Sequence, residues 1–201
     1  MNSTFGFSKA NKYKNISGDL KAARFLLIDH VIETKKAIPF EKAAEITGLD
    51  KLNELIKKNI VNLNDNNEIA YLYPVATAIT GHSVRLQDGR RFDTLCAIDS
   101  LGCASTFNMD CEVFSFCKDT GASVNLKILQ RKIETALPTT NLFVSYFDNV
   151  GGGSCCLCKI MDFFQYEKNA RDLLKQYEND GNMYFWTLSD AYKAAQMIFN
   201  N

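Results

Sequence analysis

This sequence has few histidines, no long hydrophobic run and no net charge. It contains two histidines, and its 23 Lys and Arg residues balance its 23 Asp and Glu residues. The zero net charge excludes a bulk electrostatic attraction to nucleic acid or to an anionic membrane. No apolar run approaches the ~20 residues of a membrane-spanning helix. We therefore expect neither a membrane nor a nucleic acid as a partner.

The N-terminal residues Met1–Lys14 are polar and lack the apolar stretch of a signal peptide. This absence predicts a cytoplasmic protein, in which cysteines are reduced thiols because cytosolic disulfides are rare. The seven cysteines are an odd number, which leaves at least one thiol outside any disulfide framework. So many thiols favour metal or thiol chemistry, although free cysteine is also a common small core residue.

The first part of the chain has the pattern of three helices and a hairpin. Apolar residues recur at helical spacing over 20–34, and a short helix is predicted over 40–47. Asp50 is the predicted N-cap of a third helix that runs to about Asn59. Two strands, 60–63 and 68–73, flank an Asn- and Asp-rich turn. This order predicts a winged-helix-like unit over 19–75, after a polar arm over 1–18.

A winged helix often binds DNA, but the predicted third helix argues against that here. It carries Lys51, Lys57 and Lys58, and it also carries the acidic Asp50 and Glu54. A recognition helix normally brings a basic footprint. We therefore interpret these charges as a solvated face.

The second part, 76–201, has the mixed pattern of an α+β domain. A hairpin over 83–86 and from 91 onward leads into a helix that opens near 95–101. Further strands are predicted at 112–116, 123–128, 141–147 and 183–187. Another is predicted through the cysteine cluster that follows Gly153, and Phe163 and Phe164 close it. A helix is predicted over 167–179, and its inward residues are Ala170, Leu173, Leu174 and Tyr177. A last helix is predicted after Ser189 as N-cap. The predicted fold class is therefore α+β, with a mixed or antiparallel sheet whose helices carry the cysteines.

The most informative feature is Cys96 with Asp99 three residues later, a spacing that puts both on one face of a helix. A nearby carboxylate raises the pKa of a cysteine and so does not stabilise its thiolate. It can accept the thiol proton and deliver it to a leaving group. Acyl transfer would require a histidine base, and only His82 is near in sequence. The pair therefore favours a nucleophile that is directed at a soft metal.

A second group of thiols follows at Cys155, Cys156 and Cys158. Cys155 and Cys158 form a CxxC, but a structural zinc site needs two more ligands at suitable spacing. Cys96 and Cys103 are too far apart to supply them, so zinc is not favoured. The CxxC also lacks the strand-to-helix context of a thioredoxin-like site. Three other cysteines and one histidine are interpreted as structural residues: Cys103, Cys111, Cys117 and His82.

In these residues the chain resembles the organomercurial (alkylmercury) lyases. The similarity lies in the segment 89–101 around Cys96 and Asp99, in Cys117 followed by 120–124, and in Cys158 followed by Phe163 and Phe164. The N-terminal helices and hairpin match as well, so the resemblance covers most of the chain from about Lys21.

The resemblance implies a lyase that cleaves a carbon–mercury bond by protonolysis, without an organic cofactor. Cys96 would attack mercury, Asp99 would carry the proton, and Cys96, Cys158 and Asp99 would hold the ion transiently. Thiolates suit such a soft metal. The substrate would be a small organometallic compound, and small thiols or a mercuric reductase would accept the product ion.

The sequence leaves alternatives open for the second catalytic thiol and for the function. Counting back from Phe163 without a gap selects Cys158, whereas matching the adjacent Cys–Cys pair selects Cys155. On an extended strand Cys156 and Cys158 would share a face. The alternative functions are a lyase for another organometal or organometalloid compound, and a soft-metal-binding or metal-sensing winged-helix protein without lyase activity.

Overall fold

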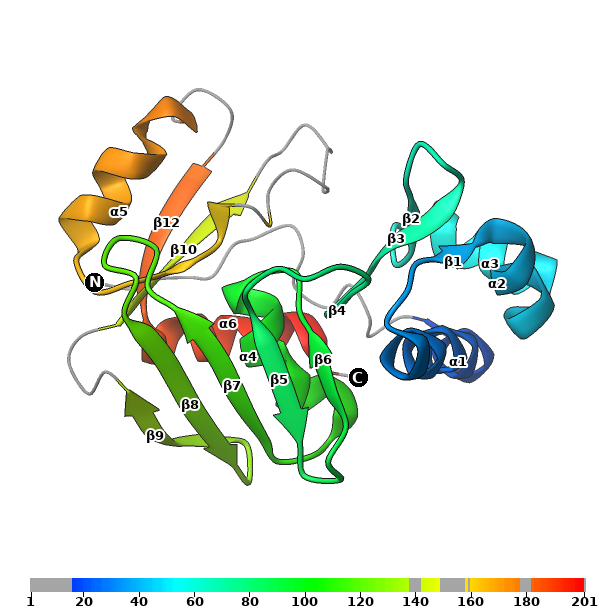
Figure 1. Ribbon diagram of the computed structural model, residues 1–201, viewed down its shortest axis with the longest axis horizontal. Helices are drawn as coiled ribbons and strands as arrows, with labels where there is room; N and C mark the ends of the chain where they lie inside the picture. The colour runs from blue at the N-terminus through cyan, green and yellow to red at the C-terminus, as the bar shows by residue number, and fades with distance from the viewer. Residues whose placement is uncertain (1–15, 138–141, 149–157, 159, 178–181, 201) are drawn as a thin grey trace.

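The computed structural model describes residues 16–137, 142–148, 158, 160–177 and 182–200. Its N-terminal unit, blue to cyan in Figure 1, combines three helices with a small antiparallel sheet of strand order β1-β3-β2, in which β4 also pairs with β3. Its elements are α1 (Gly18–Thr34), β1 (Ile38–Pro39), α2 (Phe40–Thr47), α3 (Leu49–Lys57), β2 (Asn62–Leu63), β3 (Glu68–Leu72) and β4 (Val75–Ala76).

The predicted helices and hairpin of this unit are present, but the start of the third helix differs. Gly48, at φ 85°, ends α2 and is also the residue that precedes α3. The predicted N-cap Asp50 is therefore wrong, and Asp50 lies inside the first turn. A carboxylate there is stabilised by the helix dipole without capping the helix. Glycine suits the junction because L side chains rarely adopt this φ.

In the larger part of the molecule, the described residues form two antiparallel sheets and three α-helices. A five-stranded sheet has the order β6-β5-β7-β8-β9, and a three-stranded sheet has the order β11-β10-β12. Its elements are β5 (Ser83–Leu86), β6 (Arg91–Asp93), α4 (Ala97–Phe107), β7 (Cys111–Phe116), β8 (Ser123–Leu129), β9 (Lys132–Leu137), β10 (Phe143–Asp148), β11 (Phe163–Phe164), α5 (Glu167–Leu174), β12 (Asn182–Thr187) and α6 (Leu188–Phe199). The predicted α+β class is confirmed.

Helices α4 and α6 lie against one another behind the five-stranded sheet (Figure 1). They are in close contact at Gly102, where an added Cβ would lie 2.1 Å from a ring carbon of Phe199. An isolated parallel bridge between Cys117 and Phe163 joins the end of β7 to β11. The two sheets and the helix pair thus share one hydrophobic core.

Several predictions for the C-terminal elements are wrong in detail. Thr187, not Ser189, is the N-cap of α6, because the Thr187 hydroxyl accepts a hydrogen bond from Asp190 N at 3.3 Å. On α5, Ala170 and Leu174 are buried as predicted, but Leu173 is 46% exposed. Helix α5 also ends at Leu174 and continues only as a 3₁₀ turn, Lys175–Tyr177.

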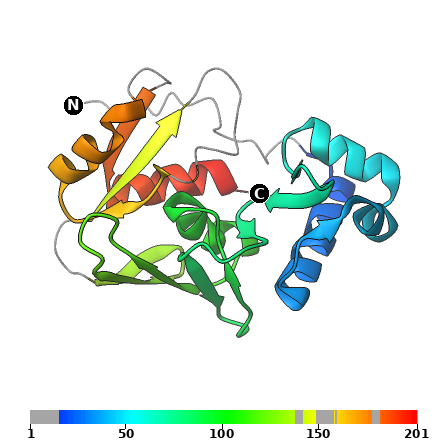
Figure 2. The ribbon, with the colours of Figure 1, turned by 45° about the horizontal axis from the view of Figure 1, so that its top comes forward.

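The N-terminal unit contacts the larger part along the chain that leads to Cys96. Val75 forms a bridge with Thr94, and Asp29 of α1 forms an ion pair with Arg90 at 2.9 Å. Figure 2 shows this unit at one end of the molecule, joined through β4. Among the described residues, no helix combines the length and the apolar character that crossing a bilayer requires.

Candidate active site

The N-terminus of α4 holds two of the predicted site residues in direct contact. Cys96 is the N-cap of this helix, and its Sγ accepts a hydrogen bond from Asp99 N at 3.5 Å. The Cys96 thiol also donates to Asp99 Oδ2 at 2.9 Å. A helix N-cap residue turns its side chain back over the first turn. The local backbone therefore places the thiol beside the carboxylate, although Cys96 itself is not helical.

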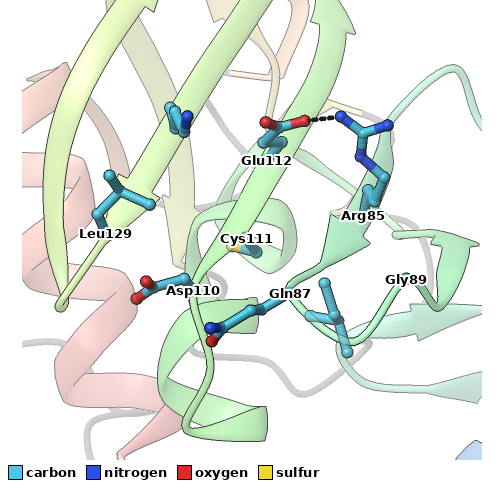
Figure 3. Close-up of a pocket in the computed structure, with 9 residues that line it drawn as sticks. Arg85, Gln87, Gly89, Asp110, Cys111, Glu112 and Leu129 are labelled. Atoms are coloured by element: carbon cyan, nitrogen blue, oxygen red, sulfur yellow. Dashed lines mark hydrogen bonds and ion pairs between the residues drawn. The ribbon is translucent and has the colours of Figure 1, made fainter.

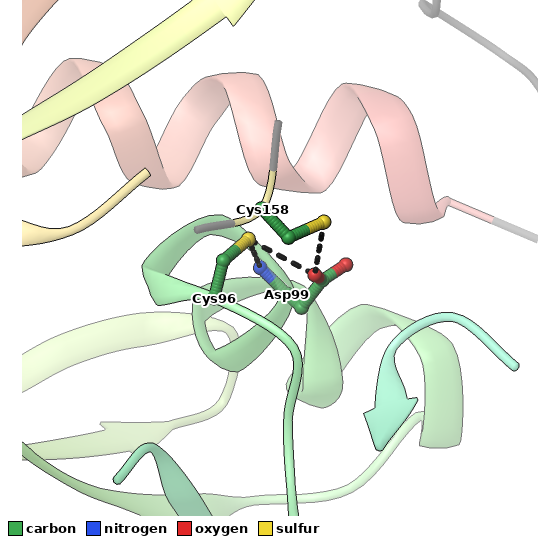
Figure 4. Close-up of side chains that lie close together, drawn as sticks. All are labelled: Cys96, Asp99 and Cys158. Carbon is green, nitrogen blue, oxygen red and sulfur yellow. Dashed lines mark hydrogen bonds between the residues drawn. The ribbon is translucent and has the colours of Figure 1, made fainter. Parts of the chain in front are cut away.

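Cys158 brings a second thiol to the same carboxylate from a distant part of the chain. Its Sγ lies 3.9 Å from Asp99 Oδ2, and one ligand atom from each of Cys96, Asp99 and Cys158 lies within 4.8 Å of the other two (Figure 4). All three side chains are buried, with exposures of 1%, 3% and 9% respectively. Two sulfurs and one oxygen at this separation can hold a single soft metal ion.

Cys158 begins a turn ahead of β11 and does not lie in the strand that the sequence predicted up to Phe163 and Phe164. Met161 N donates to Cys158 O at 3.3 Å, so the chain bends before β11 begins. The turn directs the Cys158 thiol toward Asp99 (Figure 4). Cys155 and Cys156 lie outside the described residues, so the structure describes one of the two candidate second thiols.

Burial and charge act on Cys96 in the same direction. Burial raises the pKa of its thiol well above the usual value, and the hydrogen bond with Cys158 and the negative charge of Asp99 raise it further. Loss of water disfavours the charged thiolate, and so does a neighbouring anion. Cys96 is therefore a protonated thiol at neutral pH until a cation binds to the sulfur.

Sequence reasoning missed two residues that lie at or near this site. The Tyr73 hydroxyl lies 3.9 Å from Cys158 Sγ, and Arg24 of α1 donates to Tyr73 O at 2.5 Å. Arg24 is fully buried. An arginine within an otherwise apolar helix face is a signal that the sequence carries, because a buried charge requires partners. Tyr73 has no such signal, since its position depends on how β4 meets the larger part.

The remaining described cysteines serve the core, as predicted. Cys103, Cys111 and Cys117 are buried, and none of them belongs to the Cys96–Asp99–Cys158 cluster. Cys103 donates to Asp99 O at 3.3 Å, which ties it to the helix backbone. Burial raises the pKa of Cys111 to about 12. His82 is also buried and hydrogen-bonded, in agreement with a structural role.

A separate groove lies along the five-stranded sheet. It has a volume of about 370 Å³, and its lining includes Arg85, Gln87, Asp110 and Glu112 (Figure 3). Arg85 is paired with Glu112 across β5 and β7. The groove residues do not include any of the three clustered side chains. The thiol chemistry is therefore not located in this groove.

Comparisons with known proteins identify the family of this chain. The family model for MerB, alkylmercury lyase, matches residues 75–200. The mercury-bound form of MerB2 is a structural neighbour with a TM-score of 0.64 and 17% sequence identity, and the match covers 91% of this chain and 98% of that one. A comparison with curated proteins found no match. Since the family model spans Cys96, Asp99 and Cys158 and most of the chain, this chain belongs to the alkylmercury lyase family of enzymes.

Proposed function

We propose that this enzyme cleaves the carbon–mercury bond of a small organomercurial compound by protonolysis. The observation that carries the proposal is the buried cluster of Cys96, Asp99 and Cys158, in a chain that belongs to the alkylmercury lyases. The two thiols can bind mercury, and the carboxylate that contacts both of them can accept and deliver a proton.

In the first step mercury binds to Cys96. The thiol proton passes to Asp99 Oδ2, which already accepts a hydrogen bond from it at 2.9 Å. The raised pKa of Cys96 means that the free thiol keeps its proton, so formation of the thiolate is coupled to metal binding. The group that accompanied mercury in the substrate leaves as its anion.

In the second step Cys158 binds the same mercury atom, and its proton leaves with the displaced anion. With two sulfurs bonded, the electron pair of the carbon–mercury bond moves to carbon, which takes the proton from Asp99. One hydrocarbon and one Hg(II) held by two sulfurs result, so both thiol protons are accounted for. A positioned acid of this kind contributes roughly 10²–10⁴-fold to a rate.

Several further assignments belong to the same proposal. No organic cofactor takes part, because two thiols and a carboxylate suffice for the steps above. Small thiols or a mercuric reductase accept the product ion, and the enzyme acts in the cytoplasm.

The N-terminal unit is a winged-helix-like module whose role is to cover the site, since Tyr73 lies beside Cys158. A metal sensor without lyase activity is not favoured, because the family is one of enzymes.

The decisive experiment compares single cysteine variants. Methane release from methylmercury is measured for Cys158→Ser, Cys155→Ser and, as a matched buried control, Cys103→Ser. We expect loss of turnover in Cys158→Ser and retained turnover in the other two, because a hydroxyl is a poor ligand for a soft metal. Full activity in Cys158→Ser would exclude it as the second thiol, and loss only in Cys155→Ser would assign that role to Cys155.

A further inference from the structure

The two sulfurs of the cluster are held by separate segments of chain, and one histidine contacts both segments. The backbone carbonyl of His82 accepts a hydrogen bond from Thr94 N at 2.9 Å, two residues before Cys96. The His82 ring places Nε2 3.1 Å from Asp162 Oδ1, four residues after Cys158. His82 thus connects the approach to the first thiol with the exit from the second.

Asp162 holds the backbone that follows Cys158 in place. Its carboxylate also pairs with Lys118 at 3.2 Å, while its backbone N–H donates to Ser145 Oγ at 2.9 Å. Its backbone carbonyl accepts from Ser145 N at 3.1 Å. The neighbouring Met161 O accepts from Ala97 N at 2.9 Å, which joins the turn directly to the first residue of α4.

The His82–Asp162 pair is buried and fully engaged. The two side chains are 3% and 4% exposed. The second ring nitrogen, Nδ1, lies 2.8 Å from Ser115 Oγ, so both nitrogens of the ring have partners. The ring also stacks on Phe116, with centroids 6.0 Å apart. A ring with partners on two edges and one face has a single orientation. It can therefore keep the two segments that it contacts at a fixed separation.

We propose that His82 and Asp162 are positioning residues that set the separation of the Cys96 and Cys158 sulfurs. This inference rests on the proposed function, because it concerns the two-sulfur grip on mercury. Neither side chain belongs to the cluster of ligand atoms. Each acts through the backbone of a thiol-bearing segment, in the way that outer-shell hydrogen bonds orient the ligands of a metal.

The test uses the full-length enzyme with His82→Leu, Asp162→Asn and the conservative His82→Gln, whose amide N–H₂ can replace the Nε2 donor. In His82→Leu and Asp162→Asn we expect kcat for methylmercury cleavage to fall by about 10–100-fold, the range for outer-shell changes at metal sites. KM should change by less than about threefold, because the reacting groups remain. His82→Gln should recover most of the lost kcat.

A second readout measures how tightly the two sulfurs bind Hg(II). HgCl₂ is titrated into each variant, and the ultraviolet mercury–thiolate charge-transfer band is followed with dithiothreitol as competitor. The wild type and His82→Gln should hold Hg(II) against a higher dithiothreitol concentration than His82→Leu and Asp162→Asn. Circular dichroism reports folding, and if His82→Leu does not fold, Asp162→Asn is used in its place.

The possible outcomes are distinct. Folded His82→Leu and Asp162→Asn with wild-type kcat and wild-type resistance to dithiothreitol would overturn the positioning role. Equal losses in His82→Leu and His82→Gln would also overturn it, because the donor to Asp162 would not matter. If the wild type binds Hg(II) but does not cleave methylmercury, the proposed lyase reaction fails, while the Hg(II) titration still tests the effect of the pair on the sulfurs.

Discussion

At the scale of single residues, one carboxylate oxygen contacts both thiols of the site. Asp99 Oδ2 lies 2.9 Å from Cys96 Sγ and 3.9 Å from Cys158 Sγ. The same carboxylate helps to raise the pKa of Cys96, which opposes thiolate formation in the free enzyme. The arrangement therefore suits proton transfer that begins only when a soft cation binds to sulfur.

Asp99→Asn tests this role. The amide keeps the size of the side chain but cannot carry the thiol proton, so we expect turnover of methylmercury to fall by roughly 10²–10⁴-fold. Binding of HgCl₂ should persist, because Cys96 and Cys158 remain. Asp88→Asn, an exposed turn position, is the matched control. An unchanged rate in Asp99→Asn would refute its proton-carrying role.

At the scale of elements, helix α4 carries Cys96 at its start and depends on α6 for its position. Gly102 lies in the middle of α4, against the ring of Phe199. Every residue from Ala97 to Phe107 is buried, so this helix has no solvent-exposed side on which to shift. Close contact of the two helices thus contributes to the position of Cys96.

Gly102→Ala is expected to destabilise the protein. The new Cβ would lie 2.1 Å from Phe199 Cδ2, so the ring or the helix must move. Overpacking of this kind costs about 1–3 kcal/mol in the free energy of unfolding, measured with urea. Gly18→Ala is the control, because no heavy atom lies within 4 Å of its added Cβ. Recovery in Gly102→Ala/Phe199→Leu would identify the ring as the cause.

At the scale of the whole molecule, buried thiols make stability depend on alkaline pH. Cys96, Cys103 and Cys111 all have pKa values raised mainly by burial, Cys111 to about 12 from 9.0. Between these two values the folded protein holds a proton at Cys111 that the unfolded chain has released. Stability therefore falls as pH rises through this window, since the unfolded state binds fewer protons.

This linkage is measured from urea unfolding at a series of pH values. We expect the free energy of unfolding to decline with rising pH above about pH 9, the unfolded value for Cys111. In Cys111→Val the decline over the same range should be shallower, because one thiol no longer contributes. Equal slopes in the two proteins would show that Cys111 does not contribute, whatever the difference in stability at neutral pH.

Much of the local structure was predictable because local patterns specify it. The helix 40–47 and the strand 83–86 agree with α2 and β5 at both ends, whereas β11 covers only the end of the strand that was predicted up to Phe164. The predictions are wrong where neighbouring residues are alternative N-cap residues, as at the starts of α3 and α6. Strand β9 was not predicted, because its hairpin turns at Gln130 and Arg131 with positive φ and no glycine to mark it.

Local sequence is enough to place Cys96 beside Asp99 and to give the sign of their interaction, because residues three positions apart at the start of a helix are neighbours. The contact of Cys158 with the same carboxylate, and the place of Tyr73 beside Cys158, depend on tertiary packing. The hydrogen bond between His82 and Asp162 likewise depends on tertiary packing. These contacts depend on how β4, β11 and α4 meet, and non-local packing leaves no fixed spacing in a sequence.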